Sequence, residues 1–195
     1  MVAQERGRLN KAQGWYTRSL AIREELGDRP KIGAACHQLG MVAQDRGRLD
    51  EAQDWYAKAL AIEKKLGDRP GMAATYHQLG MIAQDRGRLD EAEDWYASAV
   101  AVEKQCRDWS KMALTCAQLG LLAEKKENPG QALEWAVRSV ALFDDVPHPG
   151  SGTGPGQLAR LGSQLGTEAL EACWRRVTGG SLPDTVSDYV RSYRA

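Results

Sequence analysis

Two histidines with the same neighbours are the residues whose type and spacing could support chemistry. His37 and His77 lie 40 residues apart, and Ala117 takes the next position at that interval. Acid–base or nucleophilic catalysis needs a nucleophile or a paired acid at fixed geometry, and neither histidine has such a partner at helical spacing. The sequence therefore predicts no catalytic residue, no metal site and no cofactor, and a protein that is not an enzyme.

The four cysteines show no metal-binding spacing either. They are Cys36, Cys106, Cys116 and Cys173, and no two of them form a Cys-x2-Cys pair. Cys36 and Cys116 occupy the position that Tyr76 fills in another repeat, so we predict that they pack as small apolar core residues. Free thiols of this kind are typical of a reducing cytosol, which predicts a cytoplasmic protein.

The composition limits the possible partners. The 195 residues include 26 basic and 26 acidic side chains, and the formal net charge is zero. An even charge balance argues against nucleic acid as a main partner. No apolar run approaches the roughly 18 residues that a membrane-spanning helix needs, so we predict no membrane partner. At 43% hydrophobic residues the chain has enough apolar side chains to form a core.

An internal repeat of 40 residues organises the chain. Residues 31–70 and 71–110 are identical at 25 of 40 aligned positions. Tryptophans recur in the same register at Trp15, Trp55, Trp95 and Trp135. We predict that they pack between repeats. A period of this length is typical of a repeat array in which each unit stacks on its neighbours.

Each repeat is predicted to contain two helices. The first covers about residues 31–46 and ends at Gly47, which can adopt the left-handed conformation of a helix C-cap. The second covers about residues 50–66 and begins with a capping box, Asp50-x-x-Gln53. The same pattern predicts helix starts at Asn10 and Asp90. No stretch alternates as a strand would, so the fold class is predicted to be all-α.

The repeats resemble the tetratricopeptide repeat family, whose signature contains Leu-Gly and Ala-x3-aromatic elements. The matching residues are Leu39-Gly40 with Ala52-x3-Tyr56, and Leu79-Gly80 with Ala92-x3-Tyr96. The 40-residue period resembles the long repeats of kinesin light chains and of bacterial signalling proteins. The resemblance implies a right-handed α-α superhelix, a TPR solenoid. It also implies a non-catalytic scaffold that binds a protein or peptide in its concave groove, as the sensing or docking part of a larger bacterial signalling or conflict system.

The domain organisation follows from the repeat register. We predict a TPR array over residues 1–146, a Pro/Gly linker over 147–156 and a C-terminal helical cap over 157–195. The array divides into a half repeat, 1–30, and three repeats, 31–70, 71–110 and 111–146. Within the cap we expect one helix over about 156–178, which docks on the last repeat, and a short closing helix after Ser181.

The resemblance places the binding groove on the first helices, and helical phase selects the residues on one face. The predicted groove residues are His37, Met41, Gln44, Asp45, His77, Met81, Gln84, Asp85, Leu121 and Glu124. Gln and His can hydrogen-bond to a peptide backbone, and Met adapts to varied side chains. The alternative is that these are solvated inner-face residues without a ligand. We expect Gln44-Asp45-Arg46 and its equivalent at 84–86 to be solvated helix ends.

The N-terminal half repeat raises two alternatives. Most of its first helix is missing from the sequence, so a helix over 10–26 would expose an apolar flank. Either the chain is part of a longer protein, or that flank contacts another subunit and forms a homo-oligomer. Two functions remain as alternatives to the scaffold. One is an oligomerisation module that self-associates through this flank. The other is a nucleic-acid-binding helical repeat.

Overall fold

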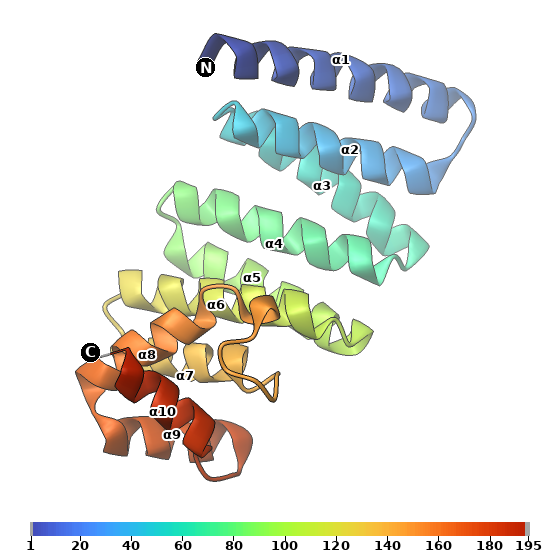
Figure 1. Ribbon diagram of the computed structural model, residues 1–195. Coiled ribbons are helices and arrows are strands. Elements are labelled where there is room, and N and C mark those ends of the chain that lie inside the picture. Colours follow the sequence, from blue (N-terminus) through green and yellow to red (C-terminus); the bar gives the residue numbers. More distant parts are fainter. Residues whose placement is uncertain (1, 194–195) are drawn as a thin grey trace. The chain divides into compact units, whose positions relative to one another are not determined.

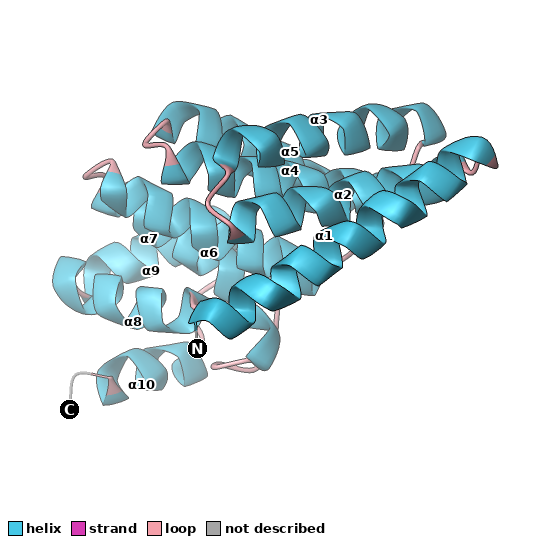
Figure 2. Ribbon diagram, turned by 90° about the horizontal axis from the view of Figure 1, so that it is seen from above, coloured by secondary structure: helices cyan, strands magenta, loops and turns pink. Residues whose placement is uncertain are grey.

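The computed structural model describes the backbone of residues 2–193 and the side chains of residues 7–193. Throughout that part of the chain the regular elements are helices joined by short loops (Figure 2), so the expected all-α repeat fold is confirmed. The chain divides into two compact units, Met1–Val102 and Glu103–Ala195, with the boundary inside one helix.

The N-terminal unit is built from consecutive helical hairpins. Its helices are α1 (Val2–Glu25), α2 (Arg29–Asp45), α3 (Leu49–Leu66), α4 (Arg69–Asp85) and the larger part of α5 (Leu89–Cys106). Helix α2 packs against both α1 and α3, and α3 also packs against α4. Figure 1 shows α2 and α4 as neighbours, with α3 behind α2.

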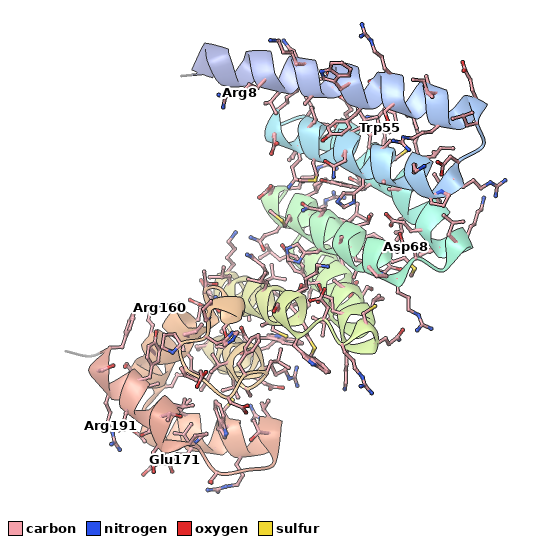
Figure 3. All side chains as sticks on the ribbon, turned by 45° about the vertical axis from the view of Figure 1, so that its right-hand side comes forward. Arg8, Trp55, Asp68, Arg160, Glu171 and Arg191 are labelled. Atoms are coloured by element: carbon pink, nitrogen blue, oxygen red, sulfur yellow. The ribbon has the colours of Figure 1, made fainter. Side chains whose placement is uncertain are left out.

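Aspartates at the repeat boundaries begin the first helices. Asp28 accepts a hydrogen bond from the Lys31 amide at 3.4 Å, and Asp68 accepts one from the Gly71 amide at 3.1 Å. Figure 3 shows Asp68 at the turn between α3 and α4. A side-chain oxygen at this position satisfies one of the free amides of the first turn. Pro70 lies in that same turn, where its missing amide is not needed.

The predicted capping boxes of the second helices are wrong. Helix α3 begins at Leu49 without a side-chain cap, and α5 begins at Leu89, so Asp50 and Asp90 lie inside the first turn. In the tight turn at Gly47 (φ 71°), the amides of Gly47 and Arg48 donate to carbonyl oxygens of α2. Helix α3 begins directly after this turn. Asp50 is then free to pair with Arg86 of the following repeat.

Helix α1 is also longer than predicted. We expected a helix start at Asn10, but α1 runs without a break from Val2 to Glu25, and Gly7 is helical where Gly47 turns the chain. Extending an existing helix adds one hydrogen bond per residue without the cost of a new helix nucleus.

In each hairpin of the N-terminal unit, a glycine backbone of the first helix lies directly against a tyrosine ring of the second helix. A Cβ at Gly40 would lie 2.6 Å from the Tyr56 ring, and one at Gly80 would lie 2.7 Å from the Tyr96 ring. Both tyrosines are fully buried. At Gly40 and Gly80 the Leu-Gly element therefore leaves room for the aromatic ring of the second helix, because glycine has no Cβ.

The C-terminal unit contains the end of α5 and the remaining helices. These are α6 (Trp109–Lys125), α7 (Pro129–Val140), the 3-10 turn η1 (Pro149–Ser151), α8 (Gly154–Leu165), α9 (Thr167–Thr178) and α10 (Asp184–Ser192). Asn128 caps α7 by accepting from the Gln131 amide at 3.1 Å. Helix α8 packs on both α6 and α7, and one continuous core runs from α7 to α10.

The single helix expected over residues 156–178 is two helices. Gly166, with φ 94° and ψ 161°, ends α8 and begins α9. The segment before α8 is also more ordered than a free linker, because Ser151 and Gly154 are buried and η1 packs on α6. A Cβ at Gly154 would collide with the Ser139 hydroxyl, so close backbone approach explains one glycine of this segment.

Tryptophan packing takes place within hairpins as well as between them. Trp95 stacks on Tyr76 of the same repeat, with ring centroids 5.7 Å apart. Trp55 packs against two neighbouring clusters, one formed with α1 and α2 and the other with α4. The expected packing between repeats is therefore only part of the role of these side chains.

Candidate protein-binding site

The open face of α2 carries two predicted groove residues, Met41 and Asp45, in one line with Gln38, which was not among them. Gln38, Met41 and Asp45 lie three or four positions apart, which places them on one side of the helix. Met41 keeps 37% of its surface exposed, and Asp45 is exposed at the C-terminal end of the line. An adaptable apolar side chain is thus flanked by an amide and a carboxylate.

Helix α4 repeats this line 40 residues later. Gln78 and Met81 are half-buried and Asp85 is exposed, in the same order along the helix. Because α2 and α4 are in contact, the two lines run side by side on adjacent helices. We refer to these six residues as the Gln-Met-Asp face: Gln38, Met41, Asp45, Gln78, Met81 and Asp85.

The two histidines lie in the packing layer beside this face. The His37 ring contacts the Tyr56 ring edge-on at 5.2 Å, and the His77 ring lies 5.3 Å from the Tyr96 ring. Burial lowers the pKa of both imidazoles below its ordinary value. They are therefore neutral at pH 7, and their contacts are with the second helices rather than with solvent alone.

The two predicted glutamines support buried tyrosines. The Tyr56 hydroxyl donates to Gln44 Oε1 at 3.0 Å, and the Tyr96 hydroxyl donates to Gln84 Oε1 at 3.5 Å. The expectation that residues 44–46 and 84–86 are solvated helix ends is wrong for these glutamines. It holds only for the exposed Asp45 and its equivalent.

Arginines at the ends of α2 and α4 connect consecutive repeats. Arg46 donates to Asn10 and Gln13 of α1. Arg86 makes the equivalent contacts on α3, an ion pair with Asp50 and a hydrogen bond to Gln53 at 2.7 Å. The predicted capping residues of the second helices thus act as acceptors for the next repeat.

A buried polar chain joins three helices of the N-terminal unit. The Thr75 hydroxyl on α4 donates to Glu63 Oε1 on α3 at 3.1 Å and lies 2.9 Å from His37 Nδ1 on α2. The other Glu63 oxygen is buried and has no hydrogen-bond partner among the described residues. Burial raises the pKa of Glu63 to about 7.

The C-terminal unit repeats part of this polar chain. The Thr115 hydroxyl donates to Glu103 Oε1 at 3.0 Å, and burial raises the pKa of Glu103 to about 7 as well. Our sequence analysis missed these carboxyl groups. The available signal was a glutamate next to an apolar residue on the buried side of a helix, with a threonine twelve residues later, in two successive repeats.

The two remaining predicted site residues belong to the C-terminal unit. Leu121 is half-buried on α6. Glu124 accepts from Arg160 of α8 through both oxygens, at 2.7 and 2.6 Å, so this carboxylate ties the cap to the last repeat. Because the two units are separate bodies, these residues are not counted with the Gln-Met-Asp face.

The Gln-Met-Asp face presents amide, thioether and carboxylate groups. Among the described residues there is no group of three or more His, Cys, Asp or Glu side chains that could hold a metal ion. None of the helices in residues 2–193 combines the length and apolar character that crossing a membrane requires. The four cysteines are free thiols, and Cys36, Cys116 and Cys173 are buried.

Comparison with known proteins identifies the repeat. The family model described as "Tetratricopeptide repeat" matches residues 1–65, 32–105 and 71–145. The chain belongs to the tetratricopeptide repeat family. Tetratricopeptide repeats generally mediate protein–protein interaction and scaffolding and are generally non-enzymatic. No curated protein matches the sequence.

Solved structures with the same fold include kinesin-light-chain-type repeats. BtubC (BKLC) from P. vanneervenii is 21% identical, with a TM-score of 0.74, covering 92% of this chain and 78% of that chain. A putative kinesin light chain from Podospora anserina is 20% identical, with a TM-score of 0.70 and coverage of 98% and 90%.

A shorter match comes from the N-terminal domain of stress-induced protein-1 (STI-1) of C. elegans. It is 19% identical, with a TM-score of 0.57 and coverage of 68% of this chain and 96% of that domain. At these identities the likeness concerns the fold.

Proposed function

We propose that this tetratricopeptide repeat protein is a non-catalytic scaffold that binds a protein or peptide on the Gln-Met-Asp face. The observation that carries the proposal is the repetition of one partly exposed line of residues on two helices in contact. In a structural repeat the buried positions recur because packing requires them. Met41 recurs at Met81 although much of its surface is open to solvent, and packing alone does not require an exposed methionine.

The chemistry of the face suits an extended segment with mixed side chains. The amides of Gln38 and Gln78 can donate to and accept from a peptide backbone. Thioethers adapt their shape to different apolar side chains. Asp45 and Asp85 place two carboxylates at one end, which favours a basic residue at the corresponding end of the ligand.

The test is selection of ligands from a random peptide library displayed on phage, with the full chain as bait. Selected peptides are then titrated against the double variant Met41→Glu/Met81→Glu. We expect at least a tenfold loss of affinity, because two carboxylates replace the apolar centre of the face.

The control is Ala57→Glu/Ala97→Glu, which adds the same two charges at the same 40-residue spacing on exposed positions of α3 and α5. This variant should retain full affinity. If both double variants bind equally well, or if no peptide can be selected, the face is not the binding site. Circular dichroism of each variant verifies that the helices are intact.

A finer part of the proposal concerns the setting. We propose that the scaffold acts in the cytoplasm as the sensing or docking part of a larger bacterial signalling or conflict system. The long repeat period and the free thiols support this setting. Tagging the protein in its own host and measuring which effector proteins are recovered with wild type, and lost with Met41→Glu/Met81→Glu, would test it. Recovery of the same effectors by both would count against it.

A further inference from the structure

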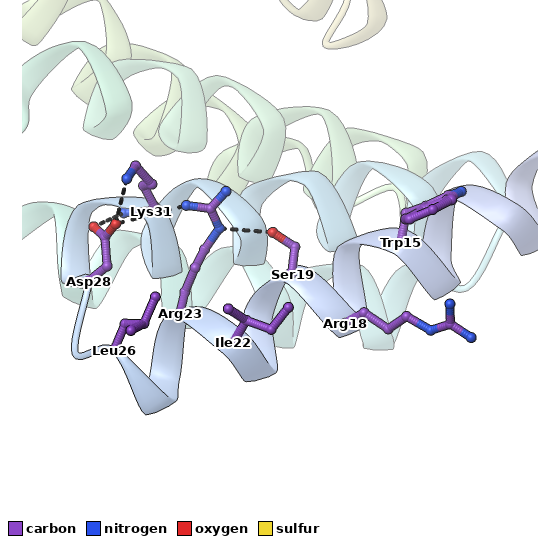
Figure 4. A pocket seen from close by; sticks show the side chains of 8 residues that line it. All are labelled: Trp15, Arg18, Ser19, Ile22, Arg23, Leu26, Asp28 and Lys31. Carbon is purple, nitrogen blue, oxygen red and sulfur yellow. Dashed lines mark hydrogen bonds and ion pairs between the residues drawn. The ribbon is translucent and has the colours of Figure 1, made fainter.

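The outer face of α1 carries an uncovered apolar strip. Trp15, Ile22 and Leu26 are 69%, 56% and 75% exposed, and they line one side of the helix together with Ser19. Figure 4 shows their side chains around a pocket of about 430 Å³. Exposed aromatic and aliphatic residues grouped in this way are typical of an interaction site.

The equivalent positions on α3 are largely covered by α2. They are Trp55, Ala59, Ile62 and Leu66, each 40 residues after its counterpart on α1, and of these four only Leu66 is exposed, at 43%. Ala59 is fully buried in a cluster with Ala35 and Cys36 of α2, and Ile62 would contact a Cβ at Gly33 at 3.2 Å. The surface of α3, the second helix of its repeat, thus packs against a first helix that carries small residues along the line of contact.

We propose that the outer face of α1 binds one helix of a partner protein, and that this helix presents the small-residue line of α2 and α4. In α4 this line includes Gly80, and Tyr76 beside it stacks on the tryptophan of the following helix. A partner helix of this type would place its aromatic residue on Trp15 and its small residues over Ser19 and Ile22. This inference does not depend on the Gln-Met-Asp face.

The charges around the strip define the partner further. Arg18, Arg23 and Lys31 line the pocket with a single acidic residue, Asp28. The Asp28 carboxylate is already engaged by Lys31 at 2.7 Å and by Arg23 at 3.9 Å. The strip therefore has an excess of positive charge, which favours a helix with acidic residues at its edges.

The same charges disfavour a second copy as the occupant. Two α1 helices packed face to face about Arg18, which lines a neighbouring part of this surface, would bring this arginine close to its own copy. Like charges across an interface are unfavourable. We therefore commit to a partner helix rather than to self-association.

The probe is a helix-stapled, fluorescein-labelled peptide with the sequence of residues 71–85, which carries the small-residue line and a net negative charge. Fluorescence anisotropy with the full chain should show saturable binding. Ile22→Glu and Leu26→Glu should each weaken it at least tenfold. Both positions are exposed, so the fold is expected to tolerate the changes.

Two controls keep the outcome specific. Ala21→Glu adds the same charge to an exposed position on another side of α1 and should leave the affinity unchanged. A peptide with Gly80→Leu should lose binding, because the larger side chain keeps the helix away from α1. Met41→Glu/Met81→Glu should bind the peptide normally, so failure of the proposed function would not be mistaken for failure here.

Absence of peptide binding to wild type, or equal binding to Ile22→Glu and Leu26→Glu, would overturn the proposal. Light scattering provides the remaining outcome. A concentration-dependent dimer that Ile22→Glu dissociates, and that the peptide does not, would show that a second copy occupies the strip and that the proposed partner is wrong.

Discussion

Helices α1 and α3 have nearly the same pattern of residues and opposite surroundings. Tyr56 of α3 is buried against Gly40 of the preceding α2, whereas the equivalent Tyr16 of α1 packs in a cluster with the following α2. Both helices supply acceptors to an arginine of the following first helix. Helix α3 is covered by α2, whereas the corresponding strip of α1 is open. In a repeat array a residue becomes core or surface according to the neighbour that covers it.

The comparison extends to the backbone. Gly47 turns the chain between α2 and α3, while Gly7 continues a helix. Four pairs of substitutions test how far this difference between the helices extends.

The largest effect is expected from Gly40→Ala. The added Cβ would lie 2.6 Å from the Tyr56 ring, so α2 and α3 must separate, which we expect to cost about 3 kcal/mol. The comparison change Gly14→Ala adds a Cβ at an exposed position of α1 with no atom within 4 Å, and should stabilise the helix by up to about 1 kcal/mol. Urea unfolding of the full chain measures both. Equal effects would mean that the hairpin contact does not limit stability.

Removal of the tryptophans compares the two surfaces directly. Trp55→Ala removes packing against two clusters and should destabilise the N-terminal unit by about 2 kcal/mol. Trp15→Ala on the open strip should change stability by less than about 0.5 kcal/mol. Amide hydrogen exchange in α2 and α3 reports the local free energy of opening. A large loss on Trp15→Ala would show that the strip is covered in solution.

The buried carboxyl of Glu63 predicts a dependence on pH that α1, with Arg23 at this position, does not share. The folded-state pKa is raised to about 7 from an ordinary 4.5, so folding favours the protonated acid. Its stability contribution is complete below about pH 4.5 and is lost as the pH rises through about 7.

Glu63→Gln should therefore raise the free energy of unfolding at pH 8 by about 1 to 3 kcal/mol and have little effect at pH 4.5. Thermal unfolding across this pH range provides the measurement. The control is Glu25→Gln at an exposed position of α1, where no change with pH is expected. An equal effect of Glu63→Gln at both pH values would contradict the assigned burial.

The smallest effect concerns the arginines that join repeats. Arg86→Gln removes an ion pair with the exposed Asp50 and should cost about 0.5 kcal/mol at low salt, and less as salt screens the pair. Arg46→Gln breaks contacts with the neutral Asn10 and Gln13, so its cost should not depend on salt. Stability measured between 20 mM and about 1 M NaCl distinguishes them. The same salt dependence for both would refute the charge assignment.

The sequence was sufficient for the fold and for part of the candidate site. The 40-residue period, the two helices per repeat and the tetratricopeptide repeat family follow from residues that recur in register. The exposed line of Met41 and Asp45 follows from helical phase. The helix starts at Asn10 and Asp50 were wrong, because a capping box describes one helix end without the turn that precedes it.

The roles of His37, Gln44 and Glu63 required the tertiary structure. Helical phase places His37 on the side of the groove, but the ring is held by Tyr56 and Thr75 on two other helices. Gln44 accepts a hydrogen bond from a tyrosine hydroxyl twelve residues away, and Glu63 accepts one from a threonine of the next repeat. Such contacts depend on the distances between helices, which local patterns do not specify.

By itself, the sequence determined the 40-residue period, the helical hairpin and the apolar positions. These features depend on interactions within one repeat, and their residue pattern recurs in successive repeats of the chain. Only the tertiary structure decided which equivalent positions are buried and which remain open to a partner. The physical reason is that burial belongs to a pair of surfaces, and the same helix surface is core beside α2 and an accessible strip on α1.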